Sequence, residues 1–310
     1  MEFVHRSVLL WECIDALNIK PDGIYLDGTL GGAGHSSEIV KRLTTGHHIG
    51  VDRDTVALEA ASQRLAPYMD RVTLVHDNFA NLASILDGLG LEKIDGMLFD
   101  LGVSSPQLDD GSRGFSYMAD APLDMRMNRD DQLTAYDVVN GWPREELRRI
   151  LFDYGEERYA PLIAAAIERR RAEKPIETTL ELVDVIRSAM PAQALREKQH
   201  PAKRSFQAIR IAVNDELGSV ERMLADAIDR LNPGGRLAVI TFHSLEDRIV
   251  KNAMQQAARG CTCPPEFPVC VCGNKPKVKV LTRNPIVSKN DELNENPRAR
   301  SAKLRVAERL

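Results

Sequence analysis

Residues 24–40 have the sequence IYLDGTLGGAGHSSEIV, and this stretch decides the fold class. It begins with a short apolar strand, passes through a glycine-rich turn and continues into a helix. The same order recurs from strands predicted at 48–51 and 72–75, and a fourth strand is predicted at 94–99. Apolar strands that alternate with helices are typical of an α/β fold, with a parallel sheet covered on both faces.

The alternation stops after the fourth strand. No strand-like run stands out from about Leu108 to Ala202, where a loop-rich stretch precedes helical apolar patterns. We therefore predict a helical domain over 108–202, inserted into a discontinuous α/β domain formed by 1–107 and 203–310.

One long helix is expected after the insertion, followed by a fifth buried strand at 237–242. The apolar residues of this helix recur every three or four positions, and residues 232–235, Asn-Pro-Gly-Gly, are expected to end the helix. The apolar positions are Phe206, Ile209, Val213, Leu217, Val220, Leu224, Ile228 and Leu231.

The composition indicates a globular protein. The chain has 310 residues, of which 43% are hydrophobic and 28% charged, and this is too apolar for a disordered chain. The net charge of −4 excludes a chain that is basic throughout. No apolar run approaches the roughly 20 residues that cross a bilayer, and the first residues lack a signal-peptide pattern. We expect a cytoplasmic protein without a membrane contact.

Polar residues follow each of the first four strands, where ligands bind to open parallel sheets. The loop 27–35 is rich in glycine, and Asp52 could accept the hydroxyls of a ribose. Phe79 could lie against an adenine, and Asp100 ends the fourth strand. Taken singly, the loop 27–35 could be a tight turn, Asp52 an exposed acid in a turn, and Phe79 a core residue that opens the next helix. Four such strand ends together favour a binding site.

The loop 27–35 excludes two common phosphate-binding patterns. It lacks the third glycine of the G-x-G-x-x-G fingerprint and the G-K-[ST] of a phosphate loop. A nucleoside ligand without a pyrophosphate fits best, and S-adenosylmethionine is the common one.

Eight strings of sequence occur in order along nearly the whole chain. They are DGTLGGAGHS (27–36), DLGVSSPQLD (100–109), RGFSY (113–117), DMRM (124–127), GEER (155–158), HPAKR (200–204), FHSLEDR (242–248) and NPRARS (296–301). These strings resemble the bacterial RsmH (MraW) family. The resemblance implies a class I (Rossmann-like) S-adenosylmethionine-dependent methyltransferase sheet with an inserted helical domain. It further implies methylation of the exocyclic N4 of a cytidine in the decoding centre (P-site region) of 16S ribosomal RNA.

The same resemblance implies the contacts of the cofactor. It assigns the methionine side to Ala33, Gly34 and His35, the ribose to Asp52, the adenine to Phe79, and the neighbourhood of the transferred methyl group to Asp100 and Gln107. For His35 a backbone contact would suffice, with the imidazole capping the helix.

The substrate-pocket candidates follow the fourth and fifth strands. They are Asp100, Ser104, Ser105, His243 and Ser244. Loop capping and turn formation are the alternative for each of these taken singly. The sequence identifies no catalytic base.

Four of the five cysteines form a cluster. Cys261, Cys263, Cys270 and Cys272 make two C-x-C pairs that could surround a zinc ion, and reduced thiols are the alternative of equal weight. Cys13 stands alone and is expected to be a core thiol.

The last 38 residues carry a local positive charge, with ten Lys or Arg against four acids. A solvated tail and a nucleic-acid contact both explain such a segment. With the family resemblance, Arg298, Arg300, Lys303 and Arg305 are expected to contact RNA.

The expected partner is 16S rRNA within the small ribosomal subunit, and a homodimer is left open. One alternative is a methyltransferase that acts on another RNA or on DNA. The other is an RNA-binding assembly factor with a vestigial cofactor pocket.

Overall fold

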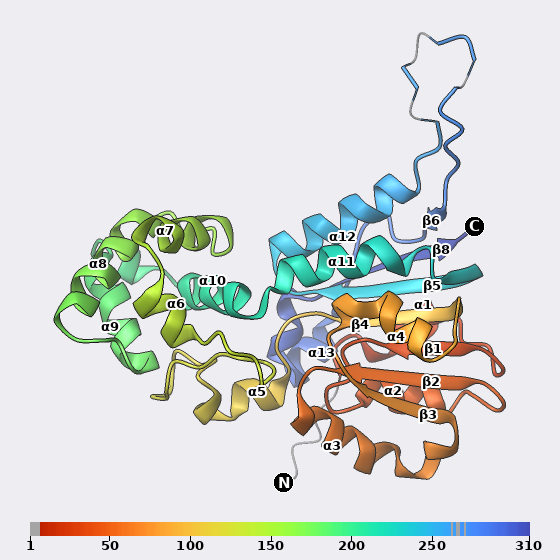
Figure 1. Cartoon of the computed structure of the whole chain (residues 1–310), viewed down its shortest axis with the longest axis horizontal. Helices are drawn as coiled ribbons and strands as arrows, with labels where there is room; N and C mark the ends of the chain where they lie inside the picture. The colour runs from red at the N-terminus through yellow and green to blue at the C-terminus, as the bar shows by residue number, and fades with distance from the viewer. Residues whose placement is uncertain (1–6, 262, 265–266, 270) are drawn as a thin grey trace. The chain divides into compact units, whose positions relative to one another are not determined.

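The computed structural model describes residues 7–261, 263–264, 267–269 and 271–310, with only the backbone of Ser105. The chain forms two compact units (Figure 1). Unit 1 consists of Met1–Gly102 and Leu217–Leu310, and unit 2 of Val103–Glu216. Unit 2 extends beyond both ends of the helical insertion expected at 108–202.

Unit 1 is built on an eight-stranded sheet in the order β3-β2-β1-β4-β5-β8-β6, with β7 paired to β8. Strands β1 to β5 are parallel, and β6, β7 and β8 are joined by antiparallel pairing. The five strands predicted from the sequence and the α/β, Rossmann-like class are confirmed. The strands are β1 (Ile24–Asp27), β2 (His47–Asp52), β3 (Val72–His76), β4 (Ile94–Asp100), β5 (Leu231–Thr241), β6 (Val278–Val280), β7 (Ile286–Val287) and β8 (Lys303–Arg309).

Helices cover both faces of this sheet, which explains its unbroken apolar strands. Met97 and Phe99 of β4 face a core shared with α4, α11 and α12, whereas Leu98 faces a core shared with α1 and α2. The helices of unit 1 are α1 (Leu10–Leu17), α2 (Gly34–Val40), α3 (Thr55–Leu65), α4 (Leu82–Gly88), α11 (Glu216–Ala227), α12 (Ser244–Ala257) and α13 (Asn290–Glu295), with short 3-10 turns at Ala66–Arg71, Phe79–Asn81 and Pro297–Ser301.

The basic C-terminal segment is part of the sheet, so its interpretation as a solvated tail is wrong. β8 pairs antiparallel with β5 from Arg236↔Glu308 to Thr241↔Lys303. Leu304 and Val306 are buried in the core of unit 1. The alternation of these apolar residues with basic ones is that of a strand, but the high local charge concealed it.

The long helix expected after the insertion is two helices, and this prediction is therefore wrong. α10 (Lys203–Asn214) ends at Asp215, which has a left-handed backbone with φ of 47°, and α11 begins at Glu216. Asp tolerates this conformation better than most residues. Phe206 packs in the core of unit 2, whereas Leu224 packs in unit 1. The apolar spacing continues through the break because each half faces a core of its own.

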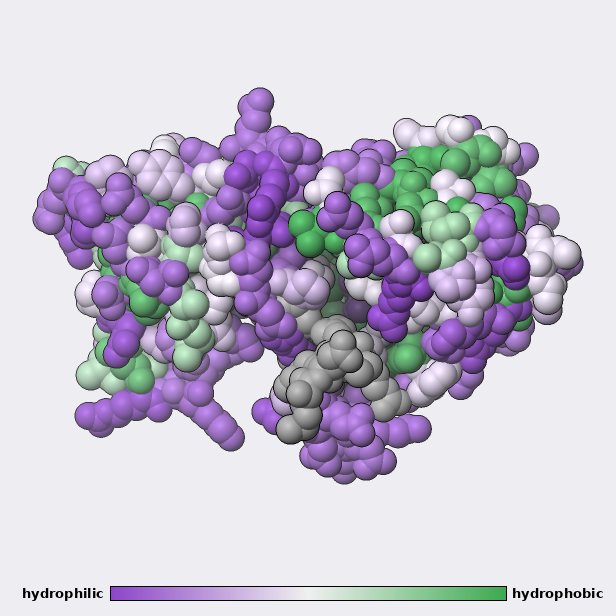
Figure 2. All heavy atoms as spheres, turned by 90° about the horizontal axis from the view of Figure 1, so that it is seen from below, coloured by the Kyte–Doolittle hydropathy of each residue, from purple (hydrophilic) through white to green (hydrophobic). Residues whose placement is uncertain are grey.

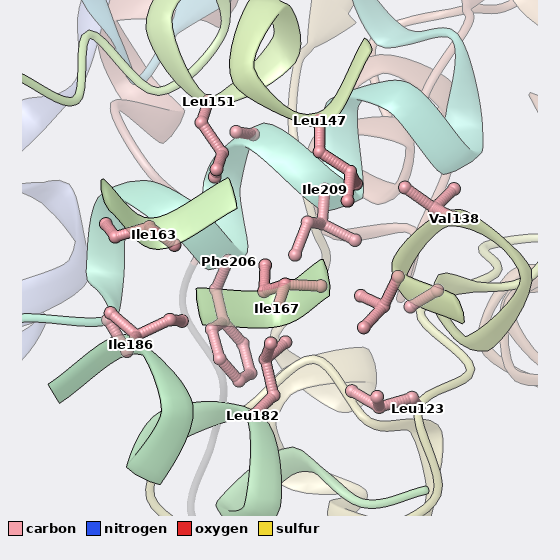
Figure 3. Close-up of a cluster of buried hydrophobic side chains, with 14 of the residues drawn as sticks. Leu123, Val138, Leu147, Leu151, Ile163, Ile167, Leu182, Ile186, Phe206 and Ile209 are labelled. Carbon is pink, nitrogen blue, oxygen red and sulfur yellow. The ribbon is translucent and has the colours of Figure 1, made fainter. Parts of the chain in front are cut away.

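Unit 2 is helical, with one isolated bridge, Pro122↔Thr178, as the only β pairing among its described residues. Its apolar side chains form a single core, which includes Leu147, Ile167 and Phe206 (Figure 3). The helices are α5 (Ser105–Asp109), α6 (Ala135–Gly141), α7 (Arg144–Asp153), α8 (Ala160–Glu173), α9 (Thr179–Ala189) and α10, with 3-10 turns at Gly111–Arg113 and Ala194–Arg196.

Within the described residues, no helix has the length and apolar character needed to span a membrane. On the face drawn in Figure 2, hydrophilic residues are widespread and hydrophobic ones form smaller groups among them.

Candidate functional site

Three acidic residues meet at one edge of the sheet because three neighbouring parallel strands end there. Asp27 closes β1, Asp52 closes β2 and Asp100 closes β4. β1 lies between the other two, so the carboxyl ends of all three strands adjoin. The sequence predicted this juxtaposition from the strand ends alone.

The glycine-rich loop after β1 crosses the same edge. Its backbone is anchored on both neighbouring strands, because Gly28 N donates to Leu98 O at 2.9 Å and Leu30 N donates to Val51 O at 3.0 Å. A Cβ at Gly28 would meet the Phe99 ring at 2.2 Å, whereas a Cβ at Gly32 would have nothing within 4 Å. The loop is therefore tightly packed at its start and open at Gly32, where a ligand can approach the backbone.

Asp27 holds the loop from beneath. Its carboxylate accepts hydrogen bonds from Ser36 Oγ at 2.7 Å and from Thr29 N at 3.2 Å. His48 Nε2 lies 2.8 Å from Ser36 Oγ. Asp27, Ser36 and His48 are buried, and Thr29 is partly buried. Burial raises the pKa of Asp27 to about 6. The sequence analysis did not single out Ser36 or His48 because neither forms a recognisable spacing with Asp27.

Asp52 contacts the loop directly. Its Oδ2 accepts a hydrogen bond from Gly31 N at 2.8 Å, and its Oδ1 accepts one from Asp54 N at 2.9 Å. Burial raises the pKa of this carboxyl to about 6. Each carboxylate oxygen retains a further lone pair. Asp52 is therefore able to accept the two hydroxyls of a ribose while it holds the loop.

Phe79 begins the 3-10 turn after β3. Its ring meets Phe99 edge-to-face, with centroids 5.7 Å apart, and it packs against the core of unit 1 while remaining partly exposed. This matches the alternative of a core phenylalanine that opens the next helix. Contact with an adenine stays a prediction.

Asp100 has an unusual environment at the end of β4. Its backbone N–H donates to Thr29 Oγ1 at 2.6 Å, but its buried Oδ1 has no hydrogen-bond partner among the described residues. Burial, together with the negative charges of Asp27 and Glu246, raises the pKa of Asp100 well above its usual range. An unpaired buried carboxylate oxygen costs about 1–3 kcal/mol, and a bound ligand with an N–H group or positive charge would remove that cost. The residues of this edge thus fit a cofactor with an ammonium group and a ribose.

The imidazole of His35 is a buried, neutral group that is hydrogen-bonded within the protein. Its Nε2 lies 3.0 Å from Val8 O, which requires the ring N–H to donate. The ring is buried, and burial lowers its pKa to about 4. A cofactor contact by His35 would therefore use its backbone. Ala33, with a left-handed φ of 55°, and Gly34 lead into the same helix.

Ser104 and Gln107 cap α5 in unit 2. Gln107 Oε1 accepts from Ser104 N at 3.0 Å, and Ser104 Oγ accepts from Gln107 N at 3.4 Å. This reciprocal capping box is the alternative role considered for Ser104. The side chain of Ser105 lies outside the described residues. The cofactor contact of Gln107 stays a prediction.

His243 and Ser244 lie where β5 leads into α12. His243 is the N-cap of this helix, and the buried Glu246 accepts backbone hydrogen bonds from Phe242 at 2.8 Å and from His243 at 3.3 Å. The sequence analysis missed Glu246, although it lies in the string 242–248. His243 has the capping role considered as its alternative, and Ser244 is exposed.

The structure corrects the expected RNA contact of Arg305 in β8, whereas that of the half-exposed Lys303 stays a prediction. Arg305 is buried and donates to Asp247 through Nε at 2.6 Å and Nη2 at 3.1 Å, and Lys303 Nζ lies 3.3 Å from the same carboxylate. Arg305 therefore has a structural ion pair instead of a free charge. Arg298 and Arg300 are exposed, and their contact with RNA stays a prediction.

The described cysteines are one core residue and one cluster. Cys13 is fully buried in the core of unit 1, as predicted. Cys261, Cys263 and Cys272 are close together after α12, whereas Cys270 lies outside the described residues.

Comparisons with known proteins identify the family of the chain. The model of the MraW methylase family matches residues 2–310. A protein of Brevibacillus brevis is 58% identical over 311 residues, which cover 100% of this chain and 99% of the relative. Proteins of Heliobacterium modesticaldum and Clostridium botulinum (strain Kyoto) are each 57% identical and are covered over 100% of both chains. All three relatives are named "Ribosomal RNA small subunit methyltransferase H". The family resemblance of the sequence is thus confirmed, and the chain belongs to the MraW methylase family of S-adenosylmethionine-dependent methyltransferases.

Proposed function

We propose that this chain transfers a methyl group from S-adenosylmethionine to the exocyclic N4 of a cytidine in the decoding centre of 16S ribosomal RNA. The names of relatives that match over 99–100% of their length support ribosomal RNA of the small subunit as the substrate. The eight sequence strings shared with the family support the cytidine N4 position.

Within the site, the observation that carries the proposal is the unpaired Oδ1 of Asp100. It is a buried hydrogen-bond acceptor at the end of β4, and β4 pairs with β1, the strand that leads into the glycine-rich loop. The ammonium group of a bound cofactor and the exocyclic amino group of a cytosine are donors that such an oxygen lacks. Without a ligand, the buried and unpaired oxygen of Asp100 destabilises the folded chain, and a ligand that donates a hydrogen bond to it would remove this cost. The site is therefore organised for binding.

The remaining residues of the edge would hold the cofactor. Asp52 accepts the ribose hydroxyls, and Phe79 presents its ring to the adenine. Backbone groups of Ala33, Gly34 and His35 contact the methionine portion, because the His35 imidazole is bonded to Val8. Gln107 is the further cofactor contact implied by the family resemblance.

S-adenosylmethionine supplies a methyl group already activated by its positive sulfur. The protein therefore has to align acceptor and donor and to exclude water. The N4 lone pair of cytosine is conjugated into the ring and is a poor nucleophile, so acceptors beside the amino group help by orienting it. Asp100 has this orienting role, with Ser104, Ser105, His243 and Ser244 as further pocket candidates. The proton of N4 passes to water after transfer, and no strong base is required.

Labelled S-adenosylmethionine and small ribosomal subunits that lack the modification provide the test, with free 16S RNA and DNA as parallel substrates. We expect label at N4 of one decoding-centre cytidine, located by mass mapping. Label on DNA or at another RNA site would replace the proposed substrate. Absence of label despite tight cofactor binding would favour an assembly factor.

The role of Asp100 is tested by Asp100→Asn in the same assay. We expect turnover to fall at saturating cofactor because the orienting carboxylate is lost. Full turnover with unchanged cofactor affinity would show that Asp100 does not orient the reacting groups.

A further inference from the structure

A second candidate site lies in the loop of residues 260–276, between α12 and β6 (Figure 1). The base of this loop is closed by hydrogen bonds from Lys277 N to Ala257 O at 2.8 Å and from Asn274 Nδ2 to Gly260 O at 2.7 Å. Its described residues form no helix or strand. Three of them, Cys261, Cys263 and Cys272, bring their sulfur atoms within 4.8 Å of one another.

The spacing of two of the sulfurs is that of metal ligands. Cys261 Sγ and Cys272 Sγ lie 3.8 Å apart. Sulfurs bound to one tetrahedral zinc at about 2.3 Å are separated by about 3.8 Å. A disulfide would need a distance of about 2.05 Å, and none of the described cysteines is in a disulfide.

Backbone N–H groups surround the same sulfurs. Cys263 Sγ accepts from Val271 N and Cys272 N, both at 3.3 Å, and Cys261 Sγ accepts from Cys263 N at 3.4 Å. Cys272 Sγ accepts from Asn274 N at 3.5 Å. A neutral thiol is a weak acceptor, whereas a thiolate accepts charge-assisted hydrogen bonds. Thiolates at this distance repel one another unless a cation lies between them.

Among the described residues of the loop, the large apolar side chains are exposed and form no core that could order it in place of a cation. Phe267, Val269 and Val271 are 51%, 69% and 73% exposed. The burial of apolar surface therefore contributes little to offset the conformational entropy of the loop. Metal binding supplies that stabilisation in small cysteine-rich segments.

We propose that Cys261, Cys263 and Cys272 bind a zinc ion that fixes the loop 260–276. Each ligating thiol loses its proton to solvent and bonds to the ion through its sulfur. Zinc suits a thiolate set because it is redox-inert and accepts tetrahedral geometry. The three described sulfurs define the site. The inference is independent of the proposed methyl transfer.

The first measurement is the zinc content of the full-length, untagged protein purified under reducing conditions without chelator. We expect about one zinc per chain. Cys261→Ser and Cys263→Ser should each reduce the content to near zero. The matched control is Val271→Ser, which changes an exposed side chain of the same loop and leaves the N–H donor to Cys263 in place. It should retain the metal.

A second measurement needs no cysteine variant. In the wild type with cobalt in place of zinc, visible bands of tetrahedral cobalt and a near-ultraviolet thiolate-to-cobalt charge-transfer band are expected. A strong chelator should abolish both bands and make the loop 260–276 sensitive to protease.

The proposal is wrong if the wild type contains no zinc and takes up none after incubation with zinc and a reductant. Full zinc content in both serine variants would also overturn it, as would a Cys261–Cys272 disulfide in protein isolated with its thiols trapped. None of these readouts involves S-adenosylmethionine or RNA, so failure here and failure of the proposed methyl transfer are distinguishable.

Discussion

Asp52 combines a structural and a ligand-binding task in one carboxylate. In Asp52→Asn, one of the two backbone donors, Gly31 N or Asp54 N, faces an NH₂ group, and the site loses an acceptor for the ribose. A hydrogen bond to a charged group contributes about 1.5–3 kcal/mol, so we expect cofactor affinity to fall by at least about tenfold. Titration calorimetry with S-adenosylmethionine measures this. The exposed Asp70→Asn should bind normally, and normal binding by Asp52→Asn would refute the role.

The buried Asp27 links stability to pH. Its pKa is about 6 in the folded chain against an ordinary value of 3.8, so the folded state holds the proton more tightly than the unfolded state. The contribution of Asp27 to stability is therefore fully present below about pH 4 and is lost as pH rises through 6. The slope is at most about 1.4 kcal/mol per pH unit for one proton.

Asp27→Asn should remove this part of the pH dependence. Urea unfolding at pH 4.5 and pH 7 should show a smaller loss of stability with rising pH in the variant than in the wild type. Asp22→Asn, at an exposed turn, is the control. An equal loss in the variant and the wild type would show that Asp27 does not titrate in this range.

At the residue scale, the sequence predicted where acids gather but not what they contact. Strand ends located Asp52 and Asp100, because a strand pattern and a following acid are local features. The inward orientation of Asp27 and its bond to Ser36 depend on how the loop folds back over the sheet. No spacing in the chain encodes that contact. The same limit explains why Glu246 was missed.

At the scale of elements, the parallel strands were predictable because each carries its own apolar run. β8 was not, since its apolar residues alternate with charged ones whose partners are distant in sequence. Arg305 of β8 contacts Asp247 of α12 across 58 residues. The break at Asp215 was equally invisible, because a change of core leaves the apolar spacing intact.

The Arg305–Asp247 pair should stabilise the join between β8 and α12. In Arg305→Ala, the Asp247 side chain, 13% exposed, keeps Lys303 as its one ion-pair partner among the described residues. Removal of one member of a buried ion pair costs about 3–5 kcal/mol of stability. Because Lys303 remains as a partner of Asp247, we expect a loss at the lower end of this range. Thermal unfolding provides the measurement. The exposed Arg300→Ala is the matched control and should unfold like the wild type, while an unchanged midpoint in Arg305→Ala would contradict the pair's role.

The whole molecule consists of two units with separate cores, and each unit contains one of the two tryptophans. Trp11 lies on α1 with the Arg42 guanidinium 5.8 Å from its ring, and Trp142 packs against the core of unit 2. Substitution of either tryptophan by phenylalanine leaves one fluorescent reporter for one unit. Because the two units have separate cores, we expect a core mutation in one unit to leave the stability of the other unit unchanged.

Ile167→Ala tests this separation. Ile167 is fully buried in unit 2, so the truncation should cost about 2–5 kcal/mol. We expect the unfolding midpoint reported by Trp142 to move to lower urea concentration, while the midpoint reported by Trp11 stays in place. Met97→Ala, at a fully buried position of β4, is the reciprocal variant and should move only the Trp11 transition. Equal shifts of both reporters would mean that the units unfold as one cooperative body, and the separate cores would then have no thermodynamic independence.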